Sequence, residues 1–450
     1  MGEGLRSWNR ETDSAALRPG LQNQPRPGVS IAGHSLHVSR CAMPRRSSVH
    51  VPPHRWVTHT TYNRRDIPMT ASHARTPHCH ARRSSAACLL SLMACAALPA
   101  WAATSTATRP QLSSSEQGSY AVASFLGSWS PGTVGTKSTG DYVVSPSGPY
   151  KTVQAAVNAA IAAGGTTRKY IQIKAGTYTG LVVIPSGVPL TVYGDSQTGV
   201  VLQLGAHYAM TGSAFKSAVG NTADFSGNAP SRVKSYYSDC GGRSTLATNC
   251  TATVVSYASQ LQIKNLTIQN TYGENNAAAN GQHQAVAYLN NGGDQVQLDT
   301  VRLLGNQDTL WLAGSGKRTY VRNSFIQGDV DFIFGDMTAV FDACEVRYTN
   351  ARTSTGAIAA PSHVIGNKGF LFKGGSFTTT GGSNSVSFAR QWPQNGGTTG
   401  QMIVREVALG GHIKKTAPWA DWNSSNPVNY GSTGNRRLAE YANTGTGAAP

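Results

Sequence analysis

Five six-residue runs of similar pattern recur along the chain, and they constrain its fold more than any other feature. They end at Ile268, Leu303, Ile326, Val346 and Phe377, so successive runs lie 35, 23, 20 and 31 residues apart. Spacings near twenty with variable insertions are typical of a solenoid, in which each repeat forms one coil and the connecting loops differ in length. No tight Asn-Gly turn joins two of these runs, as a sandwich of hairpins would favour. The pattern therefore predicts a parallel β-helix.

The composition also indicates many short strands. Charged residues make up only 13% of the 450 residues and glycines number 49, which disfavours long helices. One helix is expected over residues 152–163, where apolar residues recur at helical spacing and two glycines follow. Strand-like runs come next, at 170–173, 181–184, 190–193 and 200–204. We expect an all-β fold, a right-handed parallel β-helix whose open N-terminal edge is capped by the single helix.

The first hundred residues have the pattern of an export signal. Residues 1–68 show no hydrophobic periodicity and are expected to be disordered or a mis-assigned upstream extension. Residues 69–102 contain a basic stretch, an apolar stretch too short for a membrane span and a small-x-small cleavage site, which predicts a signal peptide. We therefore expect a secreted protein, extracellular or periplasmic, with a lipoprotein anchored at Cys95 as the alternative. The mature chain would then comprise a polar lead-in, 103–139, and a β-helix domain, 140–450.

The cysteines beyond the leader have distinct settings. Cys240 and Cys250 flank a short polar loop and are expected to form a disulfide in an oxidising compartment. Cys344 lies in a strand-like run and is expected to be buried. The body contains no CxxC pair and no HExxH motif, so no metal site is expected.

The charge of the body favours an anionic partner. After Ala103 the chain carries 25 basic and 17 acidic residues. The basic residues are scattered and do not alternate with aromatic residues in clusters, which is the pattern that nucleic-acid binding needs. An acidic polysaccharide suits this distribution at least as well.

Polar residues recur at one further interval. Gln284 precedes Gln307 by 23 residues, and Asp308 precedes Asp331 by the same number. Strands of adjacent coils lie about 4.8 Å apart, so residues at matching phase stack on one outer face. Two carboxyl groups and two amides are therefore expected to converge.

This set of groups suits ester hydrolysis. Two neighbouring carboxyl groups separate their pKa values, leaving one protonated acid and one anion. The anion can attack an ester carbonyl, the acid can protonate the leaving alcohol, and the amides can donate to the oxyanion. None of these steps needs a metal or a cofactor. Further along, Arg390 can keep a carboxylate ionised, and Trp392 can stack on a sugar ring.

The chain from Pro149 to Trp422 resembles the pectinesterases, the pectin methylesterases of plants, fungi and bacteria. NQDTLW at 306–311 and GDVDFIFG at 328–335 are similar to the family's signatures. The resemblance implies a right-handed parallel β-helix that acts on methyl-esterified polygalacturonate, here expected to be a monomer without a nucleic-acid partner, a membrane span or a cofactor. The roles that it implies are a nucleophile, a general acid/base, two oxyanion donors, a residue that orients the nucleophile and two substrate contacts: Asp331, Asp308, Gln307 with Gln284, Arg390, and Trp392 with Phe334.

One segment departs from the family pattern. The family has Gly-Arg-Pro-Trp where this chain has Ala389-Arg390-Gln391-Trp392. The Arg and the Trp are kept, but losing the Gly and the Pro can shift the loop that places them.

Structural interpretations stand beside these functional ones. Asp308 and Asp331 could cap the corners of coils, and Gln284 and Gln307 could form an amide ladder. Asp329 is expected to be a turn residue.

Other functions also remain open at this stage. A non-catalytic β-helix that binds carbohydrate, or an esterase or thioesterase with a substrate other than pectin, is compatible with the pattern. A lyase would need a calcium-binding carboxylate cluster and a polygalacturonase several grouped aspartates, and neither is evident. No G-x-S-x-G motif indicates a serine hydrolase.

Overall fold

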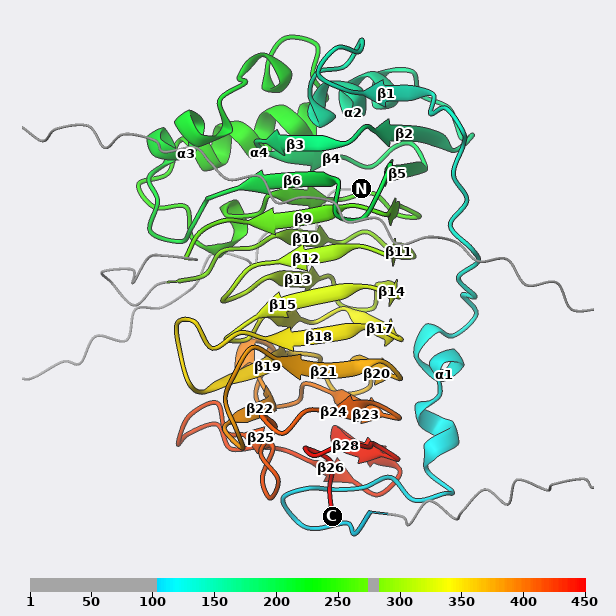
Figure 1. Ribbon diagram of the computed structural model, residues 1–450, viewed down its shortest axis with the longest axis vertical. Coiled ribbons are helices and arrows are strands. Elements are labelled where there is room, and N and C mark those ends of the chain that lie inside the picture. Colours follow the sequence, from blue (N-terminus) through cyan, green and yellow to red (C-terminus); the bar gives the residue numbers. More distant parts are fainter. Residues whose placement is uncertain (1–102, 274–282) are drawn as a thin grey trace, which may run out of the picture. The chain divides into compact units, whose positions relative to one another are not determined.

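The computed structural model describes residues 103–273 and 283–450, which wind into stacked coils with three parallel sheets (Figure 1). The expected extension, 1–68, and signal peptide, 69–102, lie outside the described residues. The prediction of an all-β parallel β-helix is confirmed. None of the helices within the described residues combines the length and the apolar character that crossing a membrane requires.

Each sheet takes one strand from successive coils. Within the described residues, sheet A has ten strands in spatial order: β1 (Tyr142–Val144), β2 (Lys169–Ile173), β5 (Leu190–Gly194), β8 (Gln262–Lys264), β11 (Val296–Asp299), β14 (Arg318–Arg322), β17 (Thr338–Asp342), β20 (Phe370–Lys373), β23 (Met402–Arg405) and β28 (Leu438–Tyr441). Sheet B has eight there: β3 (Gly176–Thr179), β6 (Val200–Leu204), β9 (Thr267–Asn270), β12 (Arg302–Leu304), β15 (Phe325–Gly328), β18 (Glu345–Tyr348), β21 (Ser376–Thr379) and β24 (Ala408–Leu409). Sheet C, within the same limits, also has eight: β4 (Val182–Ile184), β7 (Val254–Ser256), β10 (Tyr288–Asn291), β13 (Leu310–Ala313), β16 (Ile333–Gly335), β19 (Gly356–Pro361), β22 (Val386–Arg390) and β25 (Trp419–Ala420). A short antiparallel pair, β26 (Gly431–Ser432) and β27 (Asn435–Arg436), stands apart from them.

The five repeated runs are the corners at which the chain passes from sheet A to sheet B. The third residue of each run has a left-handed backbone, with φ between 49° and 64°: Asn265, Thr300, Asn323, Ala343 and Gly374. This conformation turns the chain abruptly, and few residue types other than glycine adopt it readily. A sixth corner at Glu406, with φ 59°, follows the same rule.

The fourth residue of most corners points into the interior of the solenoid. Leu266, Val301 and Cys344 are all buried at this position. The prediction that Cys344 is buried is therefore confirmed, and burial raises the pKa of its thiol to about 12. Such a thiol stays protonated and unreactive at neutral pH.

A helix covers the N-terminal end of the solenoid, as predicted. Helix α2 (Val153–Ala162) begins where the side chain of Thr152 accepts a hydrogen bond from the N–H of Ala155, at 3.1 Å. Its apolar face, including Val157 and Ala160, is fully buried against the first coils.

A helical insertion between β6 and β7 packs on the outer face of sheet C. It contains α3 (Gly212–Val219), η2 (Ala223–Phe225), α4 (Ser231–Gly241) and η3 (Thr248–Cys250). Phe215 and Val233 of this insertion belong to one buried apolar cluster with Val255 and Leu289 of sheet C. A disulfide joins Cys240 to Cys250, with the two Cα atoms 5.5 Å apart.

The lead-in, 103–139, runs along the outer face of sheet A (Figure 1). It contains η1 (Gln117–Tyr120) and α1 (Val122–Leu126), and a further short helix, η4 (Pro393–Asn395), follows β22. Phe125 and Leu126 pack against Val340 and Leu371 of sheet A. This segment thus covers apolar side chains that the solenoid would otherwise expose.

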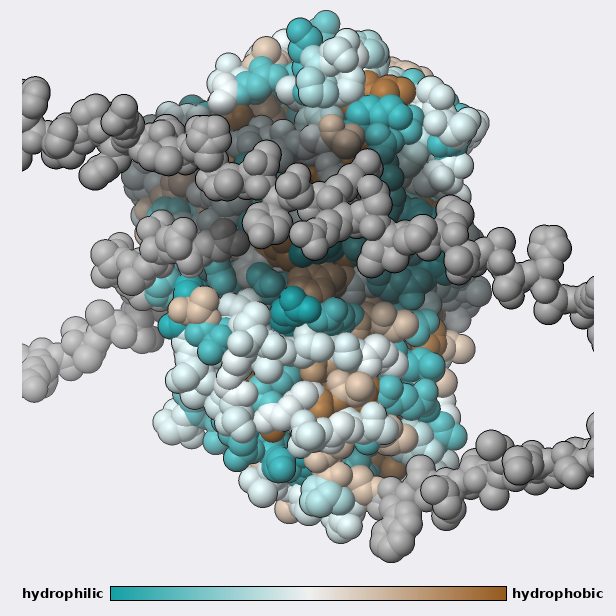
Figure 2. Space-filling model, in the orientation of Figure 1, coloured by the Kyte–Doolittle hydropathy of each residue, from teal (hydrophilic) through white to brown (hydrophobic). Residues whose placement is uncertain are grey.

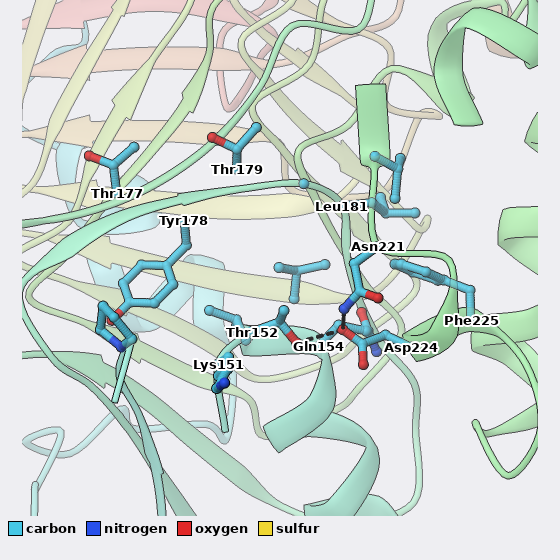
Figure 3. Close-up of a pocket in the computed structure, with 15 residues that line it drawn as sticks. Lys151, Thr152, Gln154, Thr177, Tyr178, Thr179, Leu181, Asn221, Asp224 and Phe225 are labelled. Atoms are coloured by element: carbon cyan, nitrogen blue, oxygen red, sulfur yellow. Dashed lines mark hydrogen bonds between the residues drawn. The ribbon is translucent and has the colours of Figure 1, made fainter. Parts of the chain in front are cut away.

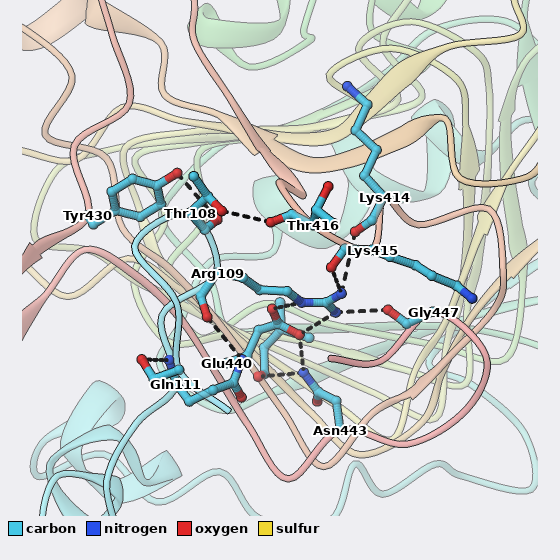
Figure 4. Close-up of polar contacts among 12 residues, drawn as sticks. Thr108, Arg109, Gln111, Lys414, Lys415, Thr416, Tyr430, Glu440, Asn443 and Gly447 are labelled. Atoms are coloured by element: carbon cyan, nitrogen blue, oxygen red, sulfur yellow. Dashed lines mark hydrogen bonds and ion pairs between the residues drawn. The ribbon is translucent and has the colours of Figure 1, made fainter. Parts of the chain in front are cut away.

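The lead-in is fixed to the last coil by a buried ion pair (Figure 4). Arg109 donates to both carboxylate oxygens of Glu440, at 2.6 and 2.9 Å, and to the carbonyl oxygens of Lys415 and Gly447, at 2.7 and 2.8 Å. The Arg109 and Glu440 side chains are only 2% and 1% exposed. One guanidinium therefore holds three segments of the C-terminal end together.

We expect Arg109→Ala to lower the free energy of unfolding by about 3–5 kcal/mol, because it leaves the Glu440 carboxylate buried without its cation. Urea unfolding at neutral pH measures this loss. Lys174→Ala is the control, since Lys174 pairs with Asp195 at 3.4 Å on the surface and should change stability by about 1 kcal/mol or less. The double variant Arg109→Met with Glu440→Leu should lose much less than Arg109→Ala alone. Equal losses at Arg109 and Lys174 would contradict a buried clamp.

Candidate active site

Asp308 and Asp331 occupy equivalent places in adjacent coils. Strands β13 and β16 pair with Leu310 opposite Ile333, and each aspartate lies two residues before its strand's member of that pair. The 23-residue interval read from the sequence is therefore the pairing interval of these two strands. The N–H of Asp308 donates to the carbonyl of Val330, at 3.2 Å, so the two chain segments are in direct contact.

Both aspartates have a left-handed backbone, with φ 67° at Asp308 and 49° at Asp331. Asp tolerates this conformation better than most residues other than glycine. At Asp331 it interrupts the in–out alternation of the strand, because Phe332 and Ile333 both enter the core that follows. The turn thus separates the Asp331 side chain from the interior that its neighbours fill.

The two carboxyl groups are buried and influence each other. Asp308 is 8% exposed and Asp331 is 5% exposed. Burial raises the pKa of Asp308 well above its ordinary value, and the charge of Asp331 raises that pKa further. Burial also raises the pKa of Asp331, but hydrogen bonds and charge from Arg390 act against it. The pair therefore favours a protonated Asp308 beside an ionised Asp331.

Arg390 holds the Asp331 carboxylate in a two-point contact. Its Nε lies 2.9 Å from Oδ1 and its Nη2 lies 2.5 Å from Oδ2 of Asp331. Behind the guanidinium, the ring centroid of Trp422 lies 4.5 Å from its carbon. The structure thus brings Arg390 to the position that the sequence analysis assigned to it and adds Trp422, for which the sequence carried no periodic signal.

The two glutamines are neighbours but are not at matching phase. Strands β10 and β13 pair Tyr288 with Leu310, an interval of 22 residues, whereas Gln284 and Gln307 are 23 apart. The expectation of matching phase for this pair is therefore wrong by one residue. The N–H of Ala285 donates to the Gln307 carbonyl at 3.2 Å, which keeps the two segments side by side.

The Gln284 side chain has an unused amide group. The N–H of Tyr208, in the helical insertion, donates to the Gln284 carbonyl at 3.0 Å and fixes its backbone. The side-chain oxygen assigned as Oε1 is buried without a protein partner. Since the two ends of a side-chain amide can exchange by a flip, this end can present either an acceptor or a donor to a ligand.

Aromatic rings form a row beside the carboxyl groups. Trp311 and Phe334 are paired in β13 and β16, with ring centroids 5.1 Å apart. Trp392 follows β22, and its ring centroid lies 6.0 Å from that of Phe334. Flat apolar rings of this kind offer stacking surfaces for a sugar.

The two residues that depart from the family pattern are well accommodated. Ala389 is fully buried in β22. Gln391 is also fully buried, and its amide donates to the carbonyls of Gly400 and Asn429, at 2.7 and 3.0 Å, and accepts from the Asn429 N–H at 2.8 Å. These bonds anchor the segment that carries Arg390 and Trp392.

A cavity of about 210 Å³ lies elsewhere, between α2, β3 and the helical insertion (Figure 3). None of the residues assigned above lines it. Its carboxylate, Asp224, accepts hydrogen bonds from Thr152 and Asn221, at 2.5 and 2.7 Å, and so ties the insertion to the start of α2. This contact accounts for the polar lining as a packing seam, and we assign the chemistry to the carboxyl pair.

Exposed groups add little that would suggest a different site. On the face shown in Figure 2, hydrophobic residues appear as small areas among hydrophilic ones. Within the described residues, the side chains close enough to share a metal are those of Asp239, Cys240 and Cys250, and a disulfide consumes both cysteines. Oxidised sulfurs offer no thiolate to a metal.

Comparisons with known proteins agree with this site. The family model described as Pectinesterase matches residues 233–450. A pectinesterase of Ralstonia solanacearum is 38% identical over 395 residues, which cover 78% of this chain and 94% of the relative. An Escherichia coli protein named as a candidate acyl-CoA thioester hydrolase, YbhC, is 30% identical over 76% of this chain and 89% of its own length. The solved structure of rice weevil pectin methyl esterase is 36% identical, covers 77% of this chain and 99% of its own, and superposes with a TM-score of 0.69.

We expect Asp308→Asn to stabilise the fold at pH 7. Because the native pKa of Asp308 is raised, the unfolded chain loses this proton first, and stability falls as pH rises from the unfolded carboxyl value, about 4, towards the native pKa. Asparagine has no charge to bury, so the melting temperature of the variant should exceed that of the wild type at pH 7 and approach it near pH 4.

Asp294→Asn is the control of opposite sign. Burial raises the pKa of Asp294, but hydrogen bonds and charge from Arg318 outweigh burial and lower it overall. This carboxylate therefore stabilises the fold above the unfolded pKa, and its loss should lower the melting temperature at pH 7. If Asp308→Asn were no more stable than the wild type at pH 7, the raised native pKa of Asp308 would be refuted.

Proposed function

Since the chain belongs to the pectinesterase family, we propose that it hydrolyses the methyl esters of pectin at the Asp308–Asp331 pair, releasing methanol and polygalacturonate. The observation that carries the proposal is an ionised carboxylate, held by Arg390 at two points, beside a buried carboxyl group with a strongly raised pKa. This pair supplies both a nucleophile and an acid. The roles below are assigned to residues of this chain on that basis.

Asp331 acts as the nucleophile in the first half of the reaction. Its carboxylate oxygen attacks the ester carbonyl of a galacturonate methyl ester, and the negative charge moves to the carbonyl oxygen. The side-chain amides of Gln284 and Gln307 donate to this oxyanion. Asp308 gives its proton to the departing methoxy oxygen, so methanol leaves and an anhydride joins the substrate to Asp331.

The second half reverses the proton transfer. Asp308, now ionised, takes a proton from water, which attacks the anhydride and restores the Asp331 carboxylate. The product is the free uronate. Arg390 stabilises Asp331 as an anion, which favours its departure from the tetrahedral intermediate as well as its initial attack.

Substrate contacts come from the rings and from the charge of the body. Phe334 and Trp392 offer apolar faces to the sugar rings next to the reacting ester. The basic body attracts an increasingly anionic polymer. Because pectin lies outside the cell, we also propose that the protein is secreted and acts as a monomer, in line with the leader pattern.

A second candidate is thioester hydrolysis. The likeness to the Escherichia coli protein favours testing it, and the same carboxyl pair could attack a thioester carbonyl. The aromatic row and the basic body favour pectin. An acyl-CoA substrate in parallel with pectin separates the two activities.

We expect the purified protein to release methanol from esterified pectin and to acidify the medium without shortening the polymer. Asp308→Asn should slow methanol release by about 10²–10⁴-fold, because it removes the acid and base. Asp331→Asn should leave still less, because it removes the nucleophile. Asp239→Asn is the control, since this carboxylate is 62% exposed and pairs with Arg243 on α4.

Methanol measured by coupled oxidation, together with polymer length by gel filtration, tests the proposal. Shortened or unsaturated chains without methanol would indicate a lyase or a glycosidase instead. Full activity of both active-site variants would contradict the assigned roles and leave a binding function.

A further inference from the structure

A second buried ion pair lies in the same turn as the nucleophile. Asp329 precedes Asp331 by two residues, and its side chain is fully buried. Arg352 donates from Nε to Oδ2 at 2.6 Å and from Nη2 to Oδ1 at 2.7 Å. The Arg352 side chain is itself only 14% exposed. The turn that carries the nucleophile is thus held by two guanidinium groups, one on each aspartate.

The two arginines come from different parts of the fold. Arg390 ends β22, whereas Arg352 lies in the loop between β18 and β19. Asp329 is also fixed by its N–H, which donates to the carbonyl of Asn306 at 3.2 Å. Arg352 reaches towards a third coil, since its Cδ would lie 3.7 Å from a Cβ placed on Gly273. The Asp329–Arg352 pair therefore joins the loop, the nucleophile's turn and the neighbouring coils.

Stability alone gives this pair little reason to be ionic. Removing two charges from water is costly, and apolar side chains of similar volume often stabilise a fold as well or better. Within the described residues, the charges that act on Asp308 are those of Asp331, Arg390, Asp329 and Arg352, two of each sign. The pair thus belongs to the balanced set of charges around the acid.

We propose that Asp329 and Arg352 are positioning residues of the active site, which hold the turn of Asp331 and balance the charge around the two carboxyl groups. The proposal rests on the proposed function of Asp308 and Asp331. Asp329 makes ionisation of both groups harder, whereas Arg352 makes ionisation of Asp308 easier. The pair also faces His283, on which its two charges act in opposite directions.

The two single variants should shift the pH dependence of methanol release in opposite directions. In the pH profile of kcat/KM, the acidic limb reports ionisation of Asp331 and the basic limb deprotonation of Asp308. Asp329→Asn removes a negative charge and should move both limbs to lower pH. Arg352→Met removes a positive charge and should move the basic limb to higher pH. We expect shifts of about 0.5–1 pH unit, and a profile close to the wild type in the double variant.

Two controls separate electrostatic positioning from general damage. Asp239→Asn and Arg243→Met make the same charge changes at an ion pair on the surface, and should leave the limbs in place. Asp329→Asn is nearly isosteric and decides the matter if Arg352→Met does not fold. Unshifted limbs, shifts of both variants in one direction, or a lower kcat without any shift would overturn the proposal.

A readout without turnover keeps this test separate from the proposed function. Carbon-13 NMR titration of labelled aspartate carboxyl groups follows Asp308 directly and should show its midpoint moving down in Asp329→Asn and up in Arg352→Met. A wild type that releases no methanol defeats the proposed function. Titration midpoints that stay in place defeat the positioning role, whatever the substrate.

Discussion

Stacking of coils in register is the constraint on which the candidate site depends. Asp308 and Asp331 meet because β13 and β16 pair at an interval of 23 residues and each aspartate precedes its strand by the same distance. A shift of one residue would turn one carboxyl group towards the core. The buried residues of the sheets oppose that shift, so the apolar interior fixes the alignment of the polar groups outside it.

Desolvation is the second constraint, and it acts against the fold. A buried carboxyl group without a cation resists ionisation, which makes Asp308 an acid and costs stability at neutral pH. Asp331 is equally buried but bonds to Arg390, so the two neighbours differ in their partners more than in their exposure. A guanidinium on one side only thus divides the roles of two chemically identical side chains.

The sequence predicted the parts of this arrangement that repeat. The five corner runs, the helix at the N-terminal end and the alignment of Asp308 with Asp331 all follow from periodic spacing. The offset between Gln284 and Gln307 was wrong by one residue, because successive pairs of coils differ in length by a residue and composition does not reveal it. Trp422 and Arg352 reach the site from loops, which have no periodicity to place them.

Loops of this kind set the detailed geometry of a solenoid site, and Gln391 illustrates how. Where the family has a proline, which stiffens the backbone by itself, this chain has a side chain that makes three hydrogen bonds to residues 400 and 429. Trp422, whose ring lies over Arg390, belongs to the segment that leads to residue 429. Gln391 therefore anchors the segment on either side of the guanidinium, with bonds to the next coil in place of a restricted dihedral angle. The same argument applies to Arg352, which fixes the opposite flank of the nucleophile's turn from a loop of its own.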